Sequence, residues 1–331
     1  MFQTKIHWRD SDKEDVIMSS DTKEQDTKGI NRRELLKAGA VGVAGIAATG
    51  LGMGTASAKT VIPDQENLWT NSKTGRRVAI INDAMLQIGP PLARNFAKMG
   101  YDLVIAQPQK GLVKELEGYG AKVVVIEGVE QEGPNDESNP EHAKKFVDAA
   151  IKNFGGFDSA YFRTAIHAGA DILNSTKEIL DKSYQSNFVA VIYALQAVLP
   201  PLMQAGQGQV LILTSASATK PLYDFLGYSA MRAAANHAVQ CASMTAAPKG
   251  VCVNAFGTNF LNYPDAVHAF GGKEAMAHVA SQIPVGRFGE PAEMAHFAMA
   301  LLDGKNMYTT GQTFMVAGGY NHKYDSLDSL D

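Results

Sequence analysis

The sequence is poor in several features that mark common classes of protein. Its 331 residues include only two cysteines and two tryptophans. Its 30 basic and 34 acidic side chains give a net charge of −4, so no charge excess points to nucleic acid or to an anionic membrane. The histidines show no metal-ligand spacing with acidic partners, and we expect no metal site. A hydrophobic content of 45% predicts a soluble globular protein instead.

The two cysteines, Cys241 and Cys252, flank a predicted helix-to-strand turn. A disulfide needs its two Cα atoms close together, which this spacing does not require. We therefore expect two buried free thiols, with a disulfide as the alternative.

The first 58 residues have the layout of an export signal rather than of a folded element. Arg32-Arg33 precede an uncharged, glycine-rich stretch from Ala38 to Gly54, and Ala56-Ser57-Ala58 forms an A-x-A cleavage pattern. The arginine pair with Leu36-Lys37 resembles a twin-arginine signal. We predict recognition by the twin-arginine export machinery, cleavage after residue 58 and a periplasmic mature protein; a retained membrane anchor is the alternative.

The mature chain alternates apolar runs of strand length with helical patterns. The seven runs are 78–82, 102–107, 122–127, 159–164, 209–215, 251–256 and 313–317. Continuous β-branched and apolar runs indicate strands buried on both faces. Helical patterns lie at 90–99, 141–153, 176–204, 229–247 and 291–301. This alternation predicts an α/β fold, a Rossmann-like doubly wound parallel sheet of about seven strands with helices on both faces.

The domain organisation follows from these runs. We expect a linker at 59–75, a single domain at 76–320 and a polar tail at 321–331. Ligands of parallel sheets bind at the carboxyl ends of the strands. Two turn-rich loops, 128–140 and 257–272, are predicted at that edge, and the second is a candidate lid.

Ser215 ends one predicted strand, and Tyr228 and Arg232 follow thirteen and seventeen positions later on one helix face. Asn187 lies on the preceding helix. A permanent cation beside a phenol favours the phenolate, so Tyr228 is a candidate base. This set, with "IPVGRFGEPAEMAHFAMALL" and "TTGQTFMVAGGY", resembles the short-chain dehydrogenase/reductase superfamily over about residues 76–320. There a lysine stands at the position of Arg232.

The resemblance also implies a dinucleotide-binding loop, Thr-Gly-x-x-x-Gly-x-Gly, which this chain replaces with "NDAMLQIG" at 82–89. Asp83 and Gln87 stand at two of the three glycine positions, and only Gly89 remains. A carboxylate at Asp83 is expected to repel phosphate. "FRTA" at 162–165 likewise replaces Asn-Asn-Ala-Gly. We therefore predict no cofactor. The alternative is NAD or NADP bound in another way, with Asn82, Ile88 and Gly89 as cofactor-binding residues.

The Ser-Tyr-Arg triad is similar to that of halohydrin dehalogenases, which share this fold and use no nicotinamide. "GTNFLNYP" at 257–264 resembles their halide loop, which implies an anion pocket of Gln87, Asn259, Phe260 and Leu261. Their first loop carries an aromatic residue that is absent here, and Asn187 fits a dehydrogenase better. In this reading Tyr228 deprotonates a vicinal halo-alcohol and Ser215 holds its oxygen, while an epoxide closes as halide leaves.

The first functional hypothesis is thus an exported dehalogenase-like lyase acting on a small molecule. The second is an NAD(P)-dependent oxidoreductase of an alcohol or carbonyl compound, with Tyr228 as proton donor. The third is a non-catalytic ligand-binding relative, against which the intact Ser215 and Tyr228 argue. The resemblance also implies a homotetramer that packs through the helices at 176–204 and 229–247.

Overall fold

The computed structural model describes residues 68–129, 136–164, 168–263, 266–269 and 271–322. The predicted export signal at 1–58, most of the predicted linker and most of the predicted tail lie outside these residues. So does the centre of the acidic loop at 128–140.

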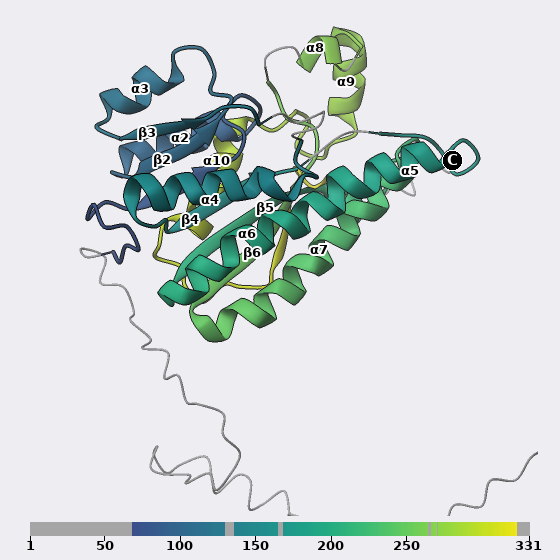
Figure 1. Ribbon diagram of the computed structural model, residues 1–331. Coiled ribbons are helices and arrows are strands. Elements are labelled where there is room, and N and C mark those ends of the chain that lie inside the picture. The colour runs from purple at the N-terminus through teal and green to yellow at the C-terminus, as the bar shows by residue number, and fades with distance from the viewer. Residues whose placement is uncertain (1–67, 130–135, 165–167, 264–265, 270, 323–331) are drawn as a thin grey trace, which may run out of the picture. The chain divides into compact units, whose positions relative to one another are not determined.

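Seven parallel strands form a single sheet in the order β3-β2-β1-β4-β5-β6-β7 (Figure 1). Their bounds are β1 Val78–Ile81, β2 Asp102–Ala106, β3 Val123–Ile126, β4 Ser159–Arg163, β5 Gly208–Ser215, β6 Val251–Thr258 and β7 Thr313–Val316. All seven predicted strands are present within one or two residues at each end, and the doubly wound α/β prediction is confirmed. Strand order reverses between β1 and β4, and the crevice at such a switch point is where these folds bind ligands.

Helices cover both faces of the sheet because β1, β2, β4, β5 and β6 bury every residue. One face carries α4 Pro140–Phe154, α6 Ala190–Ala205 and α7 Leu226–Ala246, which pack on it through the core around Phe146, Val198 and Val239. The other face carries α2 Gly89–Lys98, α3 Leu112–Gly118 and α10 Pro291–Leu302, around Leu92 and Phe96. Successive side chains of a strand point to opposite faces of the sheet, so the same strands contribute side chains to both cores.

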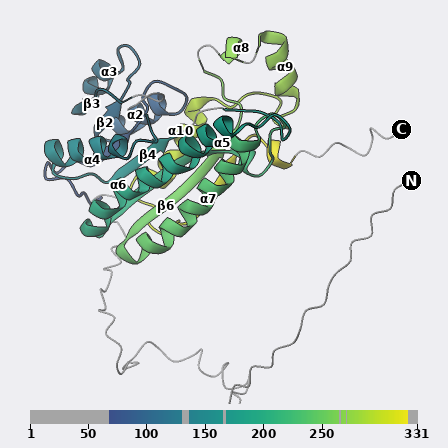
Figure 2. The ribbon, with the colours of Figure 1, turned by 45° about the vertical axis from the view of Figure 1, so that its right-hand side comes forward.

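Three helices were not predicted, and one was predicted as continuous where the structure interrupts it. The first is α3, which is short. The others are α8 Ala266–Ala269 and α9 Lys273–Ser281, which stand apart from the two helical layers (Figure 2). They occupy the predicted loop at 257–272 and the residues after it, where Asn, Pro and Gly obscure the helical pattern. The predicted helix at 176–204 consists of α5 Lys177–Tyr184, a π-helical turn at Gln185–Val189 and α6.

The residues just before β1 belong to the fold rather than to a linker. The buried Asp158 carboxylate accepts hydrogen bonds from the backbone N–H of Asn71 (2.6 Å) and of Val78 (2.7 Å) and from the Thr70 hydroxyl (3.2 Å). Burial raises the pKa of Asp158, and the nearby Arg77 guanidinium and these hydrogen bonds oppose that rise. Residues 70–78 are thereby tied to the start of β4, so the predicted boundary at 75 is too late.

The prediction of two free thiols is confirmed, and the prediction of burial is correct for Cys252 only. Both thiols are free, and Cys252 in β6 is buried, which raises its pKa to about 11. Cys241 is exposed on α7, contrary to the prediction. Its position falls on the outer face of a helix whose inner face supplies Ala235 and Val239 to the core.

Candidate active site

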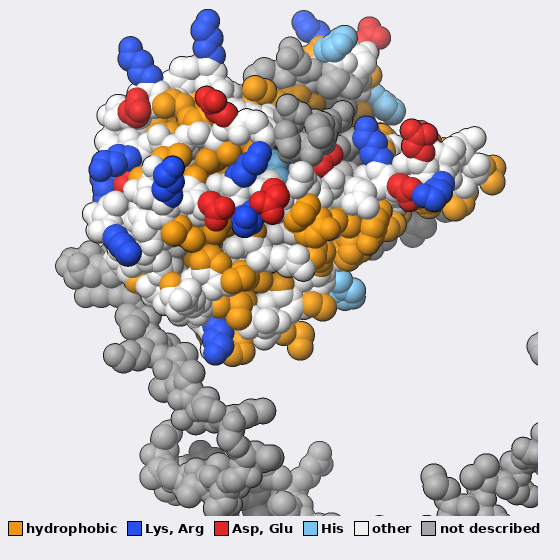
Figure 3. Space-filling view, in the orientation of Figure 1, with side chains coloured by type: hydrophobic (Ala, Val, Ile, Leu, Met, Phe, Trp, Pro, Cys, Tyr) orange, Lys and Arg blue, Asp and Glu red, His pale blue; other side chains and the backbone are white. Residues whose placement is uncertain are grey.

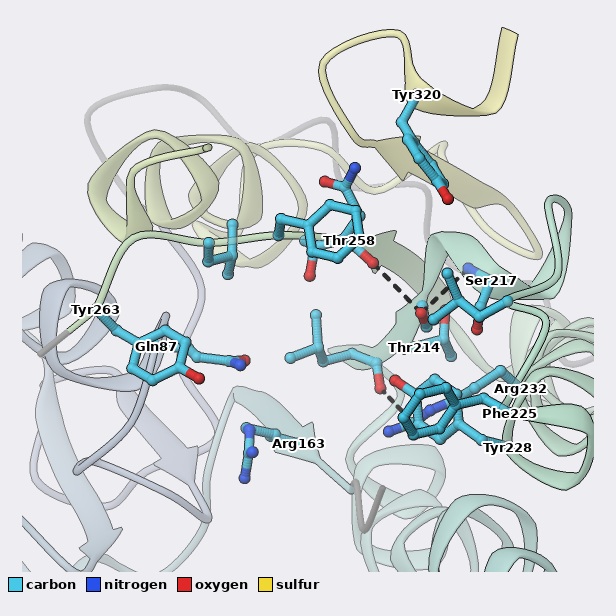
Figure 4. A pocket seen from close by; sticks show the side chains of 16 residues that line it. Gln87, Arg163, Thr214, Ser217, Phe225, Tyr228, Arg232, Thr258, Tyr263 and Tyr320 are labelled. Atoms are coloured by element: carbon cyan, nitrogen blue, oxygen red, sulfur yellow. Dashed lines mark hydrogen bonds between the residues drawn. The ribbon is translucent and has the colours of Figure 1, made fainter. Parts of the chain in front are cut away.

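A cavity of about 190 Å³ opens at the carboxyl ends of β4, β5 and β6 (Figure 4). Its described lining includes most of the predicted site residues: Gln87, Ser215, Tyr228, Arg232, Asn259, Phe260 and Leu261. Asn187, Asn82, Ile88 and Gly89 do not line it. Segments far apart in the sequence therefore meet where the resemblance places a site.

Ser215 and Tyr228 come from consecutive elements of the fold. Ser215 is the last residue of β5, where its hydroxyl donates to the Thr258 carbonyl (3.4 Å) and accepts from the Ser217 N–H (3.1 Å). Tyr228 lies in the first turn of α7 with its ring against Phe225, the centroids 6.3 Å apart. Both side chains are more than nine-tenths buried and both line the cavity. A ligand in the cavity therefore meets two side chains that carry hydroxyl groups.

Arg232 lies behind Tyr228 and is only 1% exposed. Its Nη1 donates to the Thr164 hydroxyl (3.2 Å) and to the Leu213 carbonyl (3.4 Å), and its Nη2 donates to the Thr164 carbonyl. Its guanidinium carbon is 5.2 Å from the centre of the Tyr228 ring. The expected cation beside the tyrosine is present, and it also ties α7 to the ends of β4 and β5.

Asn187 is buried in the π-helical turn rather than at the cavity. Its amide donates to the Ser183 carbonyl (3.1 Å) and to the Ser186 hydroxyl (3.0 Å). Single π-turns inside helices are rare and frequently occur at functional sites. Asn187 does not line the cavity, although the sequence predicts it as a catalytic residue.

Asp83 does not present a free carboxylate to the cavity, as the sequence had led us to expect. Its Oδ2 pairs with Arg163 Nη1 at 3.1 Å, and the two side chains are 1% and 6% exposed. Its Oδ1 accepts the N–H groups of Met85 (2.9 Å) and Leu86 (3.1 Å). The expected repulsion of phosphate by a bare charge is therefore wrong. Instead, the carboxylate accepts hydrogen bonds from two N–H groups of the loop, which are then not available to a phosphate.

The N-terminus of α2 lacks the donors that usually bind phosphate at such a position. The Gly89 N–H donates to the Leu86 carbonyl (3.2 Å), and the next two residues, Pro90 and Pro91, have no N–H. A Cβ at Gly89 would lie 1.8 Å from the Asp83 carbonyl oxygen, so only glycine fits this tight turn. Gly89 is thus explained by local packing, without a ligand.

Asn82 and Ile88, the other predicted cofactor-binding residues, are also used by the fold. The Asn82 amide donates to the Arg163 carbonyl and accepts the Arg163 N–H, both at 2.8 Å, which joins the ends of β1 and β4. Ile88 is fully buried in the core. After β2, where an acidic residue usually binds the adenosine ribose, stands Gln107, whose amide donates to the Val129 carbonyl (2.8 Å). These residues do not fit a dinucleotide held in the usual way.

The predicted halide residues form a mostly apolar wall. The Asn259 amide donates to the Ala317 carbonyl (3.3 Å), and Phe260 packs edge-on against Tyr320 with centroids 5.6 Å apart. Leu261 pairs with Gly289 in an isolated β-bridge. Gln87, by contrast, carries a polar side chain into the cavity from a left-handed backbone with φ 48° (Figure 4).

Sequence reasoning missed Arg163 as a cavity residue and Thr164 as a partner of Arg232. The available signal was a basic residue at the end of an otherwise apolar buried strand, "SAYFR". A second tyrosine near the two arginines, Tyr161, is fully buried, which raises its pKa and keeps it a neutral phenol. Tyr228 is therefore the tyrosine that both lines the cavity and neighbours Arg232.

Comparisons with known proteins agree with this architecture. A family model described as enoyl-(acyl carrier protein) reductase matches residues 86–321. Cyclohexanol dehydrogenase of Acinetobacter sp. (strain SE19) is 24% identical over 76% of this chain and 98% of its own length. L-2,3-butanediol dehydrogenase of Corynebacterium glutamicum is 27% identical over 73% of this chain and 98% of its own length.

Among solved structures, the L-sorbose reductase of Gluconobacter frateurii, complexed with NADPH and L-sorbose, superposes with a TM-score of 0.67. It is 22% identical and covers 77% of this chain and 99% of its own. At this identity the likeness shows the shared fold. These relatives are dehydrogenases and reductases, so they favour a nicotinamide-linked activity over the predicted dehalogenase and over the predicted lack of a cofactor. By its fold, its matched family model and its Ser-Tyr pair, the chain belongs to the short-chain dehydrogenase/reductase superfamily.

Proposed function

We propose that this enzyme is an oxidoreductase acting on an alcohol or carbonyl group of a small molecule. The observation that carries the proposal is that Ser215 and Tyr228 both line one cavity. Its relatives include dehydrogenases whose names give cyclohexanol and L-2,3-butanediol as substrates. Both are small alcohols of a size compatible with a cavity of about 190 Å³.

In this proposal the two hydroxyl groups act on the reacting oxygen of the substrate. Ser215 donates a hydrogen bond to that oxygen and holds it beside Tyr228. Tyr228 gives a proton to the oxygen in reduction and takes one from it in oxidation. The buried guanidinium of Arg232 lies 5.2 Å from the centre of the Tyr228 ring, so a cation stands beside the group that exchanges the proton. An opposite charge in a water-poor site has a larger effect than it would have in water.

The carrier that the relatives imply is a nicotinamide dinucleotide, since the L-sorbose reductase structure contains NADPH. The direct test is oxidation of cyclohexanol and of L-2,3-butanediol with NAD⁺ and with NADP⁺, followed by absorbance of the reduced dinucleotide. The proposal expects turnover that Tyr228→Phe strongly reduces. Absence of turnover across a panel of small alcohols and ketones with both dinucleotides would count against it.

The nicotinamide-independent dehalogenase remains a second candidate because of one specific observation. The phosphate-binding donors at the start of α2 are replaced by Asp83 contacts and by two prolines. An enzyme of this fold that uses no dinucleotide has no need of those donors. Its test is halide release from 1-chloro-2-propanol without added dinucleotide. Release that requires Tyr228 would favour this candidate, and its absence alongside dinucleotide-linked turnover would remove it.

We also propose that the mature protein works in the periplasm after export by the twin-arginine route. The support is the sequence pattern of Arg32-Arg33, the weakly hydrophobic stretch and the A-x-A site. Changing both arginines to lysine should hold the precursor in the cytoplasm, measured by cell fractionation. Undiminished periplasmic protein would refute the export route.

For assembly we propose a homotetramer, as the superfamily resemblance implies. An apolar groove runs between α6 and α7 and includes Leu195, Leu199, Met203 and Ala242, and hydrophobic side chains gather over these helices (Figure 3). Nearby Met244 is 77% exposed. Sedimentation of the purified protein and of Leu199→Glu tests this, because a buried charge would break such an interface.

A further inference from the structure

The cavity carries an excess of positive charge. Among the described residues that line it, Arg163 and Arg232 are basic and none is acidic. Asp83 compensates one of the two charges through its ion pair with Arg163. In the described part of the chain, the hydrogen-bond acceptors of Arg232 are, by contrast, neutral oxygens of Thr164 and Leu213. A buried cation without a counter-charge is costly, so the site favours a ligand that brings negative charge.

Arg163 has donors to spare for such a ligand. A guanidinium offers five N–H groups in a planar fork that matches the paired oxygens of a carboxylate or a phosphate. Only Nη1 is used by Asp83, at 3.1 Å, and Nε has no hydrogen-bond partner in the described part of the chain. The side chain is 6% exposed and lines the cavity. It is therefore a buried, oriented donor group that its ion pair satisfies only in part.

Gln87 reaches the same side of the cavity, across from Tyr228 (Figure 4). Its φ of 48° is strained for a residue with a side chain. The described residue with comparable geometry, Gln107, uses its amide to bond the Val129 carbonyl. No described residue hydrogen-bonds the Gln87 amide. Its N–H₂ group is therefore available to the same ligand as Arg163.

We propose that Arg163 and Gln87 form an oxyanion subsite that binds the carboxylate or phosphate oxygens of the ligand. The subsite replaces the backbone donors that α2 lacks, because Pro90 and Pro91 have no N–H and Asp83 occupies those of Met85 and Leu86. Two sources share this chemistry, a carboxylate on the substrate itself and the pyrophosphate of a dinucleotide. The inference rests on the proposed function only in placing the reacting oxygen at Ser215 and Tyr228.

Calorimetric titration of the mature protein with two anionic probes tests the subsite and separates its sources. The first probe is 3-hydroxybutyrate, with 3-hydroxybutyramide as its neutral analogue. The second probe is inorganic pyrophosphate. Binding of 3-hydroxybutyrate but not of its amide identifies a substrate carboxylate, and binding of pyrophosphate alone identifies the dinucleotide. If neither anion binds at millimolar concentration, or if the amide binds as tightly as the acid, the proposal is wrong.

The variant that removes the subsite charge is Asp83→Asn/Arg163→Gln, which keeps two polar side chains in contact and leaves no unpaired buried charge. It should weaken binding of the anion by at least about tenfold, the usual effect of losing a hydrogen bond to a charged group. Gln87→Glu leaves the ion pair intact and should weaken binding through repulsion.

The matched control is Arg287→Gln/Glu293→Gln, an exposed ion pair of 2.7 Å on the protein surface. This control should bind as the parent does, and anion binding unchanged in both subsite variants would overturn the proposal. Binding needs no turnover, so anion binding without any dinucleotide-linked reaction would refute the proposed oxidoreductase and leave the subsite standing.

Discussion

The two sides of the cavity have diverged to different extents. On one side, β5 and α7 retain the Ser215 and Tyr228 pair of the superfamily, with Arg232 where a lysine is usual. On the other, the loop from β1 to α2 has exchanged its glycines for an aspartate and a glutamine, and α2 starts with two prolines. The first side would hold the reacting oxygen, and the second would normally hold the dinucleotide phosphates.

The residues on each side of the cavity are positioned by a different set of contacts. Ser215 and Tyr228 are positioned by Thr258, Phe225 and Arg232. The altered loop is held by the Asp83–Arg163 ion pair and by the Asn82 amide, which bonds the backbone of Arg163. Under the proposed function, the proton-transfer groups are the usual ones, while the proposed anion-binding groups are side chains in place of backbone N–H groups.

The largest expected effect is on kcat, from a substitution on the side of the cavity formed by β5 and α7. Tyr228→Phe removes the hydroxyl that exchanges the proton and should lower kcat by roughly 10²- to 10⁴-fold, the range of general acid–base catalysis. The rate of dinucleotide-linked alcohol oxidation measures it. The control is Tyr308→Phe, at a tyrosine that is 97% exposed. A Tyr228→Phe enzyme with parental activity would show that Tyr228 does not transfer the proton.

The next effect concerns the stability of the altered side. Asp83→Asn leaves the Arg163 charge buried without its carboxylate, and it should lower the free energy of unfolding by about 3–5 kcal/mol. Urea denaturation measures the change. Asp83→Asn/Arg163→Gln should recover much of the loss, because no unpaired charge remains. Equal loss in the single and double variants would mean that the ion pair does not hold this loop.

Restoring backbone N–H donors at the start of α2 should strengthen dinucleotide binding. Pro90→Ala/Pro91→Ala returns two N–H groups to the start of α2 and leaves Gln87 in place. We expect NADPH to bind about 10- to 100-fold more tightly, since each hydrogen bond to a charged group contributes about 1.5–3 kcal/mol. Calorimetry measures the gain over the parent. A parent dissociation constant already in the micromolar range, unchanged by the substitutions, would contradict this.

The smallest expected effect on stability is at the exposed Arg287–Glu293 ion pair, which serves as a comparison for the buried Asp83–Arg163 pair. Hydrogen bonds from Arg287 and from the Glu290 N–H lower the pKa of Glu293 to about 2. A lowered folded-state pKa means that the pair stabilises the protein above the usual glutamate pKa and that this contribution disappears as pH falls toward 2. Arg287→Gln should return the Glu293 pKa toward the ordinary value of a glutamate, as followed by NMR, with little change in neutral-pH stability. A Glu293 that still titrates near 2 in the variant would exclude Arg287 as the main cause.

The sequence by itself determined the fold and half of the site. Seven apolar runs predicted the seven strands, because strands buried on both faces need continuous apolar residues. The positions of Ser215 and Tyr228 predicted one cavity wall, because a strand end and the next helix start meet at the same edge of a parallel sheet. The sequence also placed a cation beside Tyr228, since residues four apart share a helix face.

Only the tertiary structure decided what the altered loop does. Asp83 reads in the sequence as a bare charge facing phosphate, but its partner Arg163 lies eighty residues away on β4, and no local pattern joins them. A comparable separation, 68 residues, hid Thr164 as a partner of Arg232, and Arg163 was likewise missed as a residue that lines the cavity. Charges in a protein interior act through the partners that burial brings to them, and those partners are set by the order of strands in the sheet rather than by the order of residues in the chain.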